Sequence, residues 1–241
     1  MKKRILLLFS VVFVTFFLLQ FKFKNEDENF VFYTVNTKLE TIKLYYKNDK
    51  GINFGSIENV KKYLKTKKQK LLFATNGGMY KKDRSPQGLF IENNILKSKI
   101  DTLNGNGNFY LKPNGIFYLT DNNIPIICKT EDYIQNNQVK YATQSGPMLV
   151  INGEIHTSFN TKSINLNIRN GVGVLPNNEV IFAMSKKEIN FYDFAQFFKR
   201  KGCKNALYLD GFVSRTYCPK ANWVQTDGDF GVMIGITNNK K

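Results

Sequence analysis

Four short segments of the chain combine polar side chains with glycines, and each lies at the end of an apolar run that is typical of a buried strand. Loops at strand ends hold side chains on a rigid scaffold, so these residues are candidates for a catalytic or binding site. Asn-Gly and Asp-Gly are also common turn dipeptides, and a simple turn is the alternative for each segment taken singly. The segments are Asn76-Gly77-Gly78-Met79-Tyr80, Ser145-Gly146-Pro147-Met148, Arg169-Asn170-Gly171-Val172-Gly173 and Asp210-Gly211-Phe212-Val213-Ser214-Arg215.

Residues for several other chemistries are scarce. His156 is the one histidine and no Cys-x-x-Cys motif occurs, so zinc sites and histidine-dependent triads are not expected. His156 itself is expected to be an exposed strand residue. The carboxylates of Asp227-Gly228-Asp229 have a spacing that a metal accepts, but no third acid is near, which favours a loop. The sequence predicts no cofactor and leaves a divalent cation open.

The three cysteines leave two structures open. Cys128, Cys203 and Cys218 are an odd set, which allows one disulfide with a leftover thiol in three pairings. Three small buried thiols are the equal alternative.

Taken together and in this order, the four segments resemble the phosphodiester glycosidase family, whose best-known member is the uncovering enzyme, N-acetylglucosamine-1-phosphodiester alpha-N-acetylglucosaminidase. Family members carry an Asn-Gly-Gly turn, a Ser-Gly-Pro segment, an arginine at a strand entry, and a Leu-Asp-Gly turn with a serine three residues beyond the glycine. Here these features are Asn76 to Met79, Ser145 to Pro147, Arg169, and Leu209 to Ser214. The resemblance covers residues 71–236 and is closest to short exported bacterial members. The chain departs from the animal-type enzymes at Phe212, where they have a second glycine.

The resemblance implies hydrolysis of the bond between a sugar anomeric carbon and a phosphodiester. The phosphate leaves as a weakly basic anion with a second pKa of about 6, so the general acid of ordinary glycosidases is less necessary. Asp210 is then the expected base, nucleophile or oxocarbenium stabiliser, and an Asx turn is its structural alternative. Arg169 offers a planar fork to two phosphate oxygens, with a surface charge as its alternative. Asn76 is the third catalytic candidate.

The remaining candidates are expected to bind substrate. Backbone N–H groups of Gly77 and Gly78 are suited to an anion-binding nest, and the other polar groups would orient sugar hydroxyls or phosphate. For the glycines at 77, 78, 146 and 211, a requirement for positive φ is an equal alternative. The candidates are Gly77, Gly78, Ser145, Gly146, Asn170, Gly211, Ser214 and Arg215.

Apolar runs separated by Asn, Gly and Pro turns indicate antiparallel hairpins over the middle of the chain. Two helices are expected, one over 57–67 and one that begins after Asn190 as N-cap and ends at Gly202. The pattern predicts a single α+β domain over 30–241, with a mixed, largely antiparallel sheet and a few packed helices. The expected strands are 30–35, 41–46, 71–75, 89–92, 109–112, 116–119, 148–151, 172–175, 180–184, 206–209 and 231–236.

The amino terminus indicates export. Met1-Lys2-Lys3-Arg4 precedes an apolar run over 5–19, which is typical of a signal peptide, and no Ala-x-Ala site follows, so 1–24 is either a removed signal or an uncleaved anchor. A polar linker follows at 25–29. The basic end is expected in the cytoplasm and the domain in the periplasm or on the outer face of the inner membrane.

The chain of 241 residues carries a formal charge of +16, which suits a polyanionic partner. The codon drift of an AT-rich genome explains much of it, and the export segment argues against nucleic acid. The sequence therefore predicts an exported hydrolase that acts on a sugar-phosphate or anionic glycan of the envelope, such as a teichoic-type polymer or exopolysaccharide. The alternative is a catalytically silent glycan-binding or assembly protein of the envelope.

Overall fold

The computed structural model describes residues 27–211 and 213–238. The chain divides into two units, Met1–Phe30 and Val31–Lys241, and the second holds the elements described below. The predicted export segment at 1–24 lies outside the described residues. Among those that are described, no helix combines the length and apolar character that a membrane span requires.

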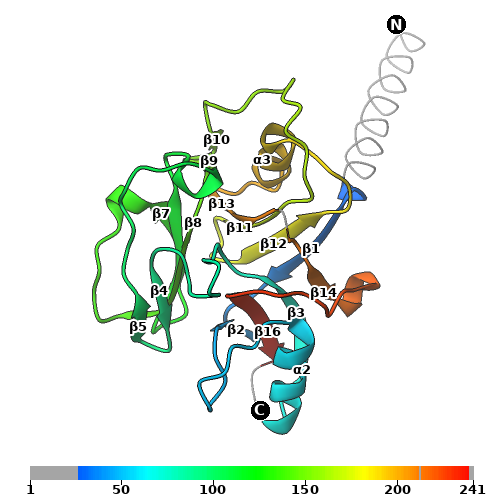
Figure 1. The fold of residues 1–241 in the computed structure, drawn as a ribbon. Helices are drawn as coiled ribbons and strands as arrows, with labels where there is room; N and C mark the ends of the chain where they lie inside the picture. Colours follow the sequence, from blue (N-terminus) through cyan, green and yellow to red (C-terminus); the bar gives the residue numbers. More distant parts are fainter. Residues whose placement is uncertain (1–26, 212, 239–241) are drawn as a thin grey trace, which may run out of the picture. The chain divides into compact units, whose positions relative to one another are not determined.

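The described strands form three sheets (Figure 1). The first has the order β1 (Phe30–Val35), β12 (Val180–Ser185), β11 (Asn170–Val174), β13 (Asn205–Asp210), β9 (Met148–Ile151) and β10 (Glu154–Ile155). The second has the order β15 (Trp223–Val224), β14 (Thr216–Cys218), β3 (Leu71–Asn76), β16 (Met233–Asn238) and β2 (Glu40–Tyr45). The third has the order β5 (Ile95–Ser98), β4 (Phe90–Glu92), β8 (Val139–Ser145), β6 (Gly115–Thr120) and β7 (Pro125–Lys129).

Two α-helices pack beside these sheets, and local sequence signals explain where each begins. The first, α2 (Ile57–Thr66), starts where the Ser56 side chain accepts the N–H of Asn59. The second, α3 (Phe191–Arg200), starts where the Asn190 side chain accepts the N–H of Asp193. Both are N-caps of the expected kind. Three 3-10 turns are also described: η1 (Asn108–Tyr110), η2 (Thr130–Asp132) and η3 (Pro219–Ala221).

One core unites the three sheets. Phe73 of β3 stacks on Phe182 of β12 with ring centroids 5.6 Å apart, and Phe117 of β6 meets Phe182 edge-on at 6.0 Å. Each of these rings comes from a different sheet and each is buried. The α+β class and the largely antiparallel pairing are therefore confirmed, with the strands distributed over three sheets.

The tight turns confirm two predicted hairpins. Asn93 and Asn94 join β4 to β5 with φ of 52° and 63°, and Asn152 and Gly153 join β9 to β10 with φ of 51° and 87°. Positive φ at both central residues is the requirement of a type I′ turn, whose twist matches that of the flanking strands.

The strand predicted at 109–112 is wrong. Phe109 belongs to the 3-10 turn η1 and is buried. Its carbonyl accepts the side-chain N–H of Asn114 at 2.9 Å, so a side chain replaces the ladder partner that a strand would need. The three cysteines are free thiols, with Cys203 and Cys218 buried and Cys128 half-buried.

Candidate functional site

Three strand ends from two sheets meet at one point. Asn76 ends β3 of the second sheet, while Asn170 begins β11 and Asp210 ends β13 in the first sheet, where they are paired residues. The interiors of these strands are mostly apolar and buried, and Asn76 and Asn170 are polar side chains that are themselves completely buried. The structure thus brings together three of the predicted site residues.

Asn170 links the two sheets and is completely buried. Its Nδ2 donates toward Thr75 Oγ1 at 2.8 Å, Asn76 O at 2.9 Å and Asn76 Oδ1 at 3.0 Å. Its Oδ1 accepts the backbone N–H of Asp210 at 2.9 Å and lies 3.4 Å from Ser214 Oγ. A buried amide with this many partners fixes the relative position of all four chain segments.

The turn after β13 is anchored to the same network. Ser214 Oγ donates to the carbonyl of Asp210 at 2.8 Å, and the N–H of Arg215 donates to Asn76 Oδ1 at 3.1 Å. Asn76 Nδ2 is buried without a hydrogen-bond partner among the described residues. The backbone that carries Asp210 is therefore held from both sides.

The Asp210 carboxylate lies in a partly buried position. Burial raises its pKa from 3.8 to about 6, and the bond that Oδ1 accepts from the Gly211 N–H, 2.7 Å long, opposes that rise. This bond joins Asp210 to the next residue, whereas an Asx turn, the structural alternative for Asp210, needs a bond to the N–H two residues on. A carboxylate with a pKa near 6 is ionised at neutral pH, yet it accepts a proton far more readily than an exposed aspartate does.

Two tyrosines that the site prediction did not include face Asp210. Burial is the main cause that raises the pKa of Tyr208 and of Tyr80, and the charge of Asp210 is the next cause for each. Strand β13 has a register shift between its pairs Tyr208–Gly171 and Asp210–Asn170, so the regular alternation of side chains is interrupted between Tyr208 and Asp210. The sequence does contain a signal for Tyr208: a side chain with a polar hydroxyl stands two positions before Asp210 in a mostly apolar strand.

Arg169 is fully buried, so the surface-charge alternative is wrong. Its Nε donates to Ile189 O at 2.8 Å and its Nη2 to Asn165 O at 2.8 Å. Its guanidinium lies 3.7 Å from the ring centroid of Phe191. Nη1 is buried without a hydrogen-bond partner among the described residues. The sequence predicted that the guanidinium binds two phosphate oxygens. Its Nε and Nη2 instead bind backbone carbonyls of the protein, and Nη1 is the guanidinium nitrogen left without a hydrogen-bond partner among the described residues.

A stack of flat groups covers Arg169. His156 stacks on Phe159 at 4.7 Å between centroids, Phe159 stacks on Phe191 at 5.0 Å, and the guanidinium of Arg169 lies on Phe191. His156 is buried, so its predicted exposure is wrong. Its Nδ1 accepts the N–H of Ser158 and its Nε2 lies 3.1 Å from the Lys112 carbonyl, which makes it a structural residue. Burial lowers its pKa.

The segment 145–148 supports β13 from its other side. Ser145 Oγ is buried and donates to the carbonyl of Leu209 at 2.7 Å. The carbonyl of Pro147 accepts the N–H of Tyr208 at 3.1 Å. Both bonds position the strand that ends at Asp210, and the Ser145 hydroxyl is already occupied by that contact.

The four predicted glycines do not have positive φ, so that alternative is wrong. They are needed for close approach: a Cβ at Gly77 would lie 2.8 Å from Ile234 Cγ1, one at Gly78 would lie 2.5 Å from Thr143 Oγ1, and one at Gly146 would lie 2.9 Å from the Phe109 carbonyl. A Cβ at Gly211 would overlap the Tyr208 hydroxyl.

The expected anion nest at Gly77 and Gly78 is not formed as predicted. The N–H of Gly77 donates to the Val232 carbonyl at 2.8 Å and is not available to a ligand.

The outer rim of the site is held by ion pairs. Arg215 Nε donates to Asp227 Oδ2 at 2.8 Å, and Nη1 donates to the Ser214 carbonyl at 3.0 Å. Arg84 pairs with Asp229. The carboxylates of Asp227 and Asp229 therefore each bind an arginine. The sequence favoured a loop over a metal site here, and these two ion pairs hold that loop in place.

Known proteins are similar to this chain in sequence. The sequence pattern of a family described as phosphodiester glycosidase matches residues 69–237. The uncharacterised protein YigE of Escherichia coli is 34% identical over 186 residues, covering 77% of this chain and 72% of YigE.

Solved structures are similar in fold at low sequence identity. The auto-inhibited catalytic domain of zebrafish N-acetylglucosamine-1-phosphodiester alpha-N-acetylglucosaminidase has a TM-score of 0.59 and 14% identity, covering 88% of this chain and 84% of that one. A putative exported protein of Burkholderia pseudomallei has a TM-score of 0.56 and 9% identity, covering 86% of this chain and 73% of that one.

Proposed function

The chain belongs to the phosphodiester glycosidase family, and we propose that it is a hydrolase that cleaves the bond between a sugar anomeric carbon and a phosphodiester. The observation that carries this proposal is the buried network at Asp210: Asn170 and Ser214 bond to the Asp210 backbone, and Asn76 bonds to Asn170. A buried network of this kind preorganises one carboxylate with little freedom to reorient. Preorganised charge is the main means by which enzymes stabilise a charged transition state.

Asp210 supplies the negative charge that an oxocarbenium-like transition state requires. The departing phosphate needs little protonation because its second pKa is about 6. One carboxylate therefore suffices for the bond that breaks, either by stabilising the sugar cation or by attacking the anomeric carbon. The charge of Asp210 acts on both Tyr80 and Tyr208. The Tyr80 hydroxyl donates to the Asp229 carbonyl at 2.9 Å and Tyr208 is buried, so both tyrosines have structural contacts beside the carboxylate.

We place this activity outside the cytoplasm. The apolar run that follows Lys2, Lys3 and Arg4 is typical of an export segment, and the similar Burkholderia protein is described as a putative exported protein. Envelope and extracellular glycans are the polymers of that location that contain sugar-phosphodiester bonds, and they are the proposed substrates.

The test is turnover of a chromogenic sugar-1-phosphodiester by the full-length protein and by Asp210→Asn. We expect the variant to lose at least tenfold in kcat, equivalent to about 1.4 kcal/mol of barrier. The carboxamide has the shape of the carboxylate, and its Oδ1 still accepts the Gly211 N–H, so the fold is retained. Asp132→Asn is the matched control because Asp132 is exposed.

Two outcomes would contradict the proposal. Turnover by Asp210→Asn within tenfold of the unchanged protein would remove Asp210 from the chemistry. Tight binding of the phosphodiester without turnover would favour the catalytically silent glycan-binding protein instead.

A further inference from the structure

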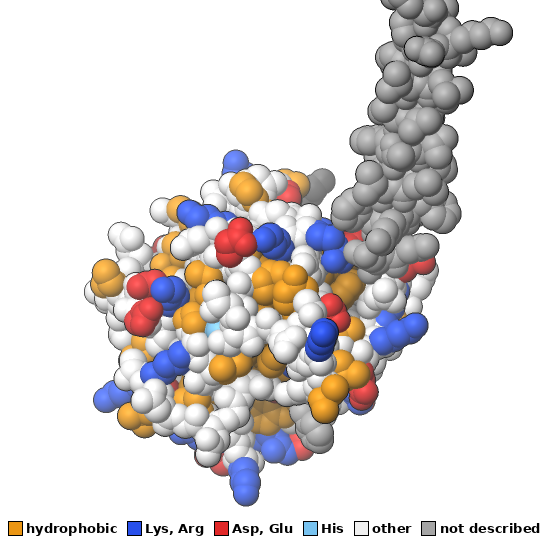
Figure 2. Space-filling view, turned by 90° about the horizontal axis from the view of Figure 1, so that it is seen from above, with side chains coloured by type: hydrophobic (Ala, Val, Ile, Leu, Met, Phe, Trp, Pro, Cys, Tyr) orange, Lys and Arg blue, Asp and Glu red, His pale blue; other side chains and the backbone are white. Residues whose placement is uncertain are grey.

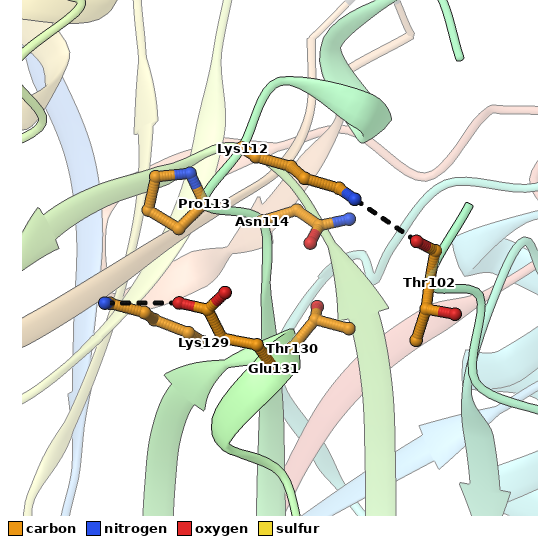
Figure 3. A pocket seen from close by; sticks show the side chains of 7 residues that line it. All are labelled: Thr102, Lys112, Pro113, Asn114, Lys129, Thr130 and Glu131. Atoms are coloured by element: carbon orange, nitrogen blue, oxygen red, sulfur yellow. Dashed lines mark hydrogen bonds and ion pairs between the residues drawn. The ribbon is translucent and has the colours of Figure 1, made fainter. Parts of the chain in front are cut away.

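A cavity outside the Asp210 site has the lining of a ligand site. Its volume is about 380 Å³, and its walls are residues 112–114, residues 129–131 and Thr102. That volume lies within the range of small-ligand sites. Figure 3 shows the side chains of Lys112 and Asn114 extending in the same direction from one wall, with Lys112 reaching Thr102 and Thr130 on the wall below. We call this the lysine cavity.

The floor of the lysine cavity is rigid and polar. Asn114 and Thr130 are buried, and the N–H of Thr130 donates to the carbonyl of Asn114 at 3.0 Å, which joins two walls. Asn114 Nδ2 donates to the Phe109 carbonyl at 2.9 Å, and Thr130 Oγ1 accepts Gln144 Nε2 at 3.3 Å. Polar groups held in this way are preorganised for a hydroxylated ligand.

The rim of the lysine cavity is positively charged. Lys112 Nζ donates to the Thr102 carbonyl at 3.2 Å, a neutral partner, while Lys129 Nζ pairs with Glu131 Oε1 at 3.3 Å (Figure 3). The two ammonium groups and one carboxylate leave a net charge of +1. Hydroxyl and amide groups below a positive rim fit a sugar that carries an anionic substituent.

The lysine cavity is also connected to the Asp210 site. The carbonyl of Pro113 accepts the N–H of Met148 at 2.9 Å, so residues 112–114 lie against the segment 145–148. That segment in turn bonds to β13 through Ser145 and Pro147. One layer of backbone thus separates the cavity wall from the strand that ends at Asp210.

We propose that the lysine cavity binds a second, phosphate-bearing repeat of the glycan whose phosphodiester is cleaved at Asp210, so that the preferred substrate is a polymer. This inference rests on the proposed function and deepens it. A single-repeat diester would occupy the Asp210 site alone, whereas an oligomer would gain the contacts of the cavity as well. Lys112 would then be a specificity residue for chain length rather than a catalytic residue.

The experiment compares two probes on the full-length protein: an oligomer of N-acetylglucosamine 1-phosphate repeats and its single-repeat methyl diester. Lys112→Gln should raise KM for the oligomer about tenfold, the cost of one lost charged hydrogen bond. We expect kcat to be unchanged, and both constants for the single repeat to be unchanged. Lys187→Gln, at an exposed position outside the cavity lining, is the control.

A second variant reverses the sign of the effect. Glu131→Gln removes the carboxylate partner of Lys129, so oligomer binding should become several-fold tighter, which a merely destabilising change would not produce. Equal effects on both probes, or weaker oligomer binding by Glu131→Gln, would overturn the proposal. Calorimetric titration with the oligomer, with each variant combined with Asp210→Asn to slow turnover, reports binding, so a failure of the proposed hydrolase activity is distinguishable from a failure of the cavity.

Discussion

Asp210 combines a catalytic position with an energetic cost to the fold. Its pKa is raised by burial from 3.8 to about 6, so between these two pH values the folded chain binds more protons than the unfolded chain. Stability then falls as pH rises through this window, and the full cost is present above pH 6. A shift of this size corresponds to a penalty on the order of 2 kcal/mol at neutral pH.

We therefore expect Asp210→Asn to be more stable than the unchanged protein at pH 7, by on the order of 2 kcal/mol, and about equal to it below pH 3.8. Urea denaturation of both proteins at the two pH values measures the difference. Opposite behaviour, with a loss of stability at pH 7 and no difference at low pH, would mean that Asp210 is stabilised by its surroundings when ionised.

The ionised form of Asp210 is also the form that the chemistry requires. We expect kcat/KM of the full-length protein to rise with pH through about 6 and then to level off, because deprotonation of Asp210 limits activity below that point. A pH–rate profile measures this. A profile that is flat between pH 5 and 7 would contradict a pKa near 6 for the essential carboxylate.

Among the predicted site residues, Asn170 has a side chain that joins the first and second sheets, and it is completely buried. Asn170→Ala removes its bonds to Thr75, to Asn76 and to the backbone of Asp210. The partners are buried and would remain unsatisfied, so we expect a loss of about 2–4 kcal/mol. Chemical denaturation measures it, with the exposed Asn106→Ala as control. A loss below about 1 kcal/mol would mean that water replaces the side chain.

At the scale of elements, the segment 156–168 is a strap that covers Arg169. Asn165 binds the guanidinium, and Phe159 lies between His156 and Phe191 in the stack. The rest of the strap is mostly exposed, and Ile164 is 94% exposed. A long irregular segment is held in place when a few such contacts fix it at points along its length.

Removal of the Phe159 ring should loosen this strap. We expect Phe159→Ala to lose about 1–3 kcal/mol of stability and to be cut faster by trypsin after Lys162, which is exposed within the strap. Ile164→Ala should leave both quantities unchanged, because that side chain is almost fully exposed. Unchanged cleavage of Phe159→Ala would show that Asn165 and the strap ends suffice to hold it.

At the scale of the whole molecule, the formal charge is +16. Figure 2 shows lysine and arginine side chains spread over one face, with acidic side chains among them and no single basic patch. Scattered positive charge raises the encounter rate with any polyanion and decreases in effect with salt. We therefore expect specific recognition of the proposed substrate at Asp210 and the lysine cavity.

Whether residues 1–24 are retained determines whether the positive charge of the protein lies next to a membrane surface. No small-residue cleavage site follows the apolar run over 5–19, so we expect the protein to remain in the membrane fraction with residues 1–24 attached. Mass spectrometry of the mature protein measures where it begins. A first residue beyond Leu19 would show that the segment is removed as a signal peptide.

The features that the sequence determined by itself are local in the chain. Helix caps at Ser56 and Asn190, the hairpin turn at Asn93 and Asn94, and the glycine-rich segments all depend on contacts between residues a few positions apart. Such signals can be recognised in the sequence because residue propensity, turn chemistry and hydrophobic periodicity depend on residues that are close together in the chain. The family resemblance rests on the same short segments.

The features that only the tertiary structure decided join residues that are distant in the chain. Asn76 and Asn170 are 94 positions apart and meet because two different sheets pack together. Tyr208 faces Asp210, Arg169 is buried under the strap, and His156 is buried in its stack. Strand order and sheet packing set these contacts. Side-chain alternation along a strand predicts which face of the sheet a side chain lies on, but it does not predict which element packs against that face.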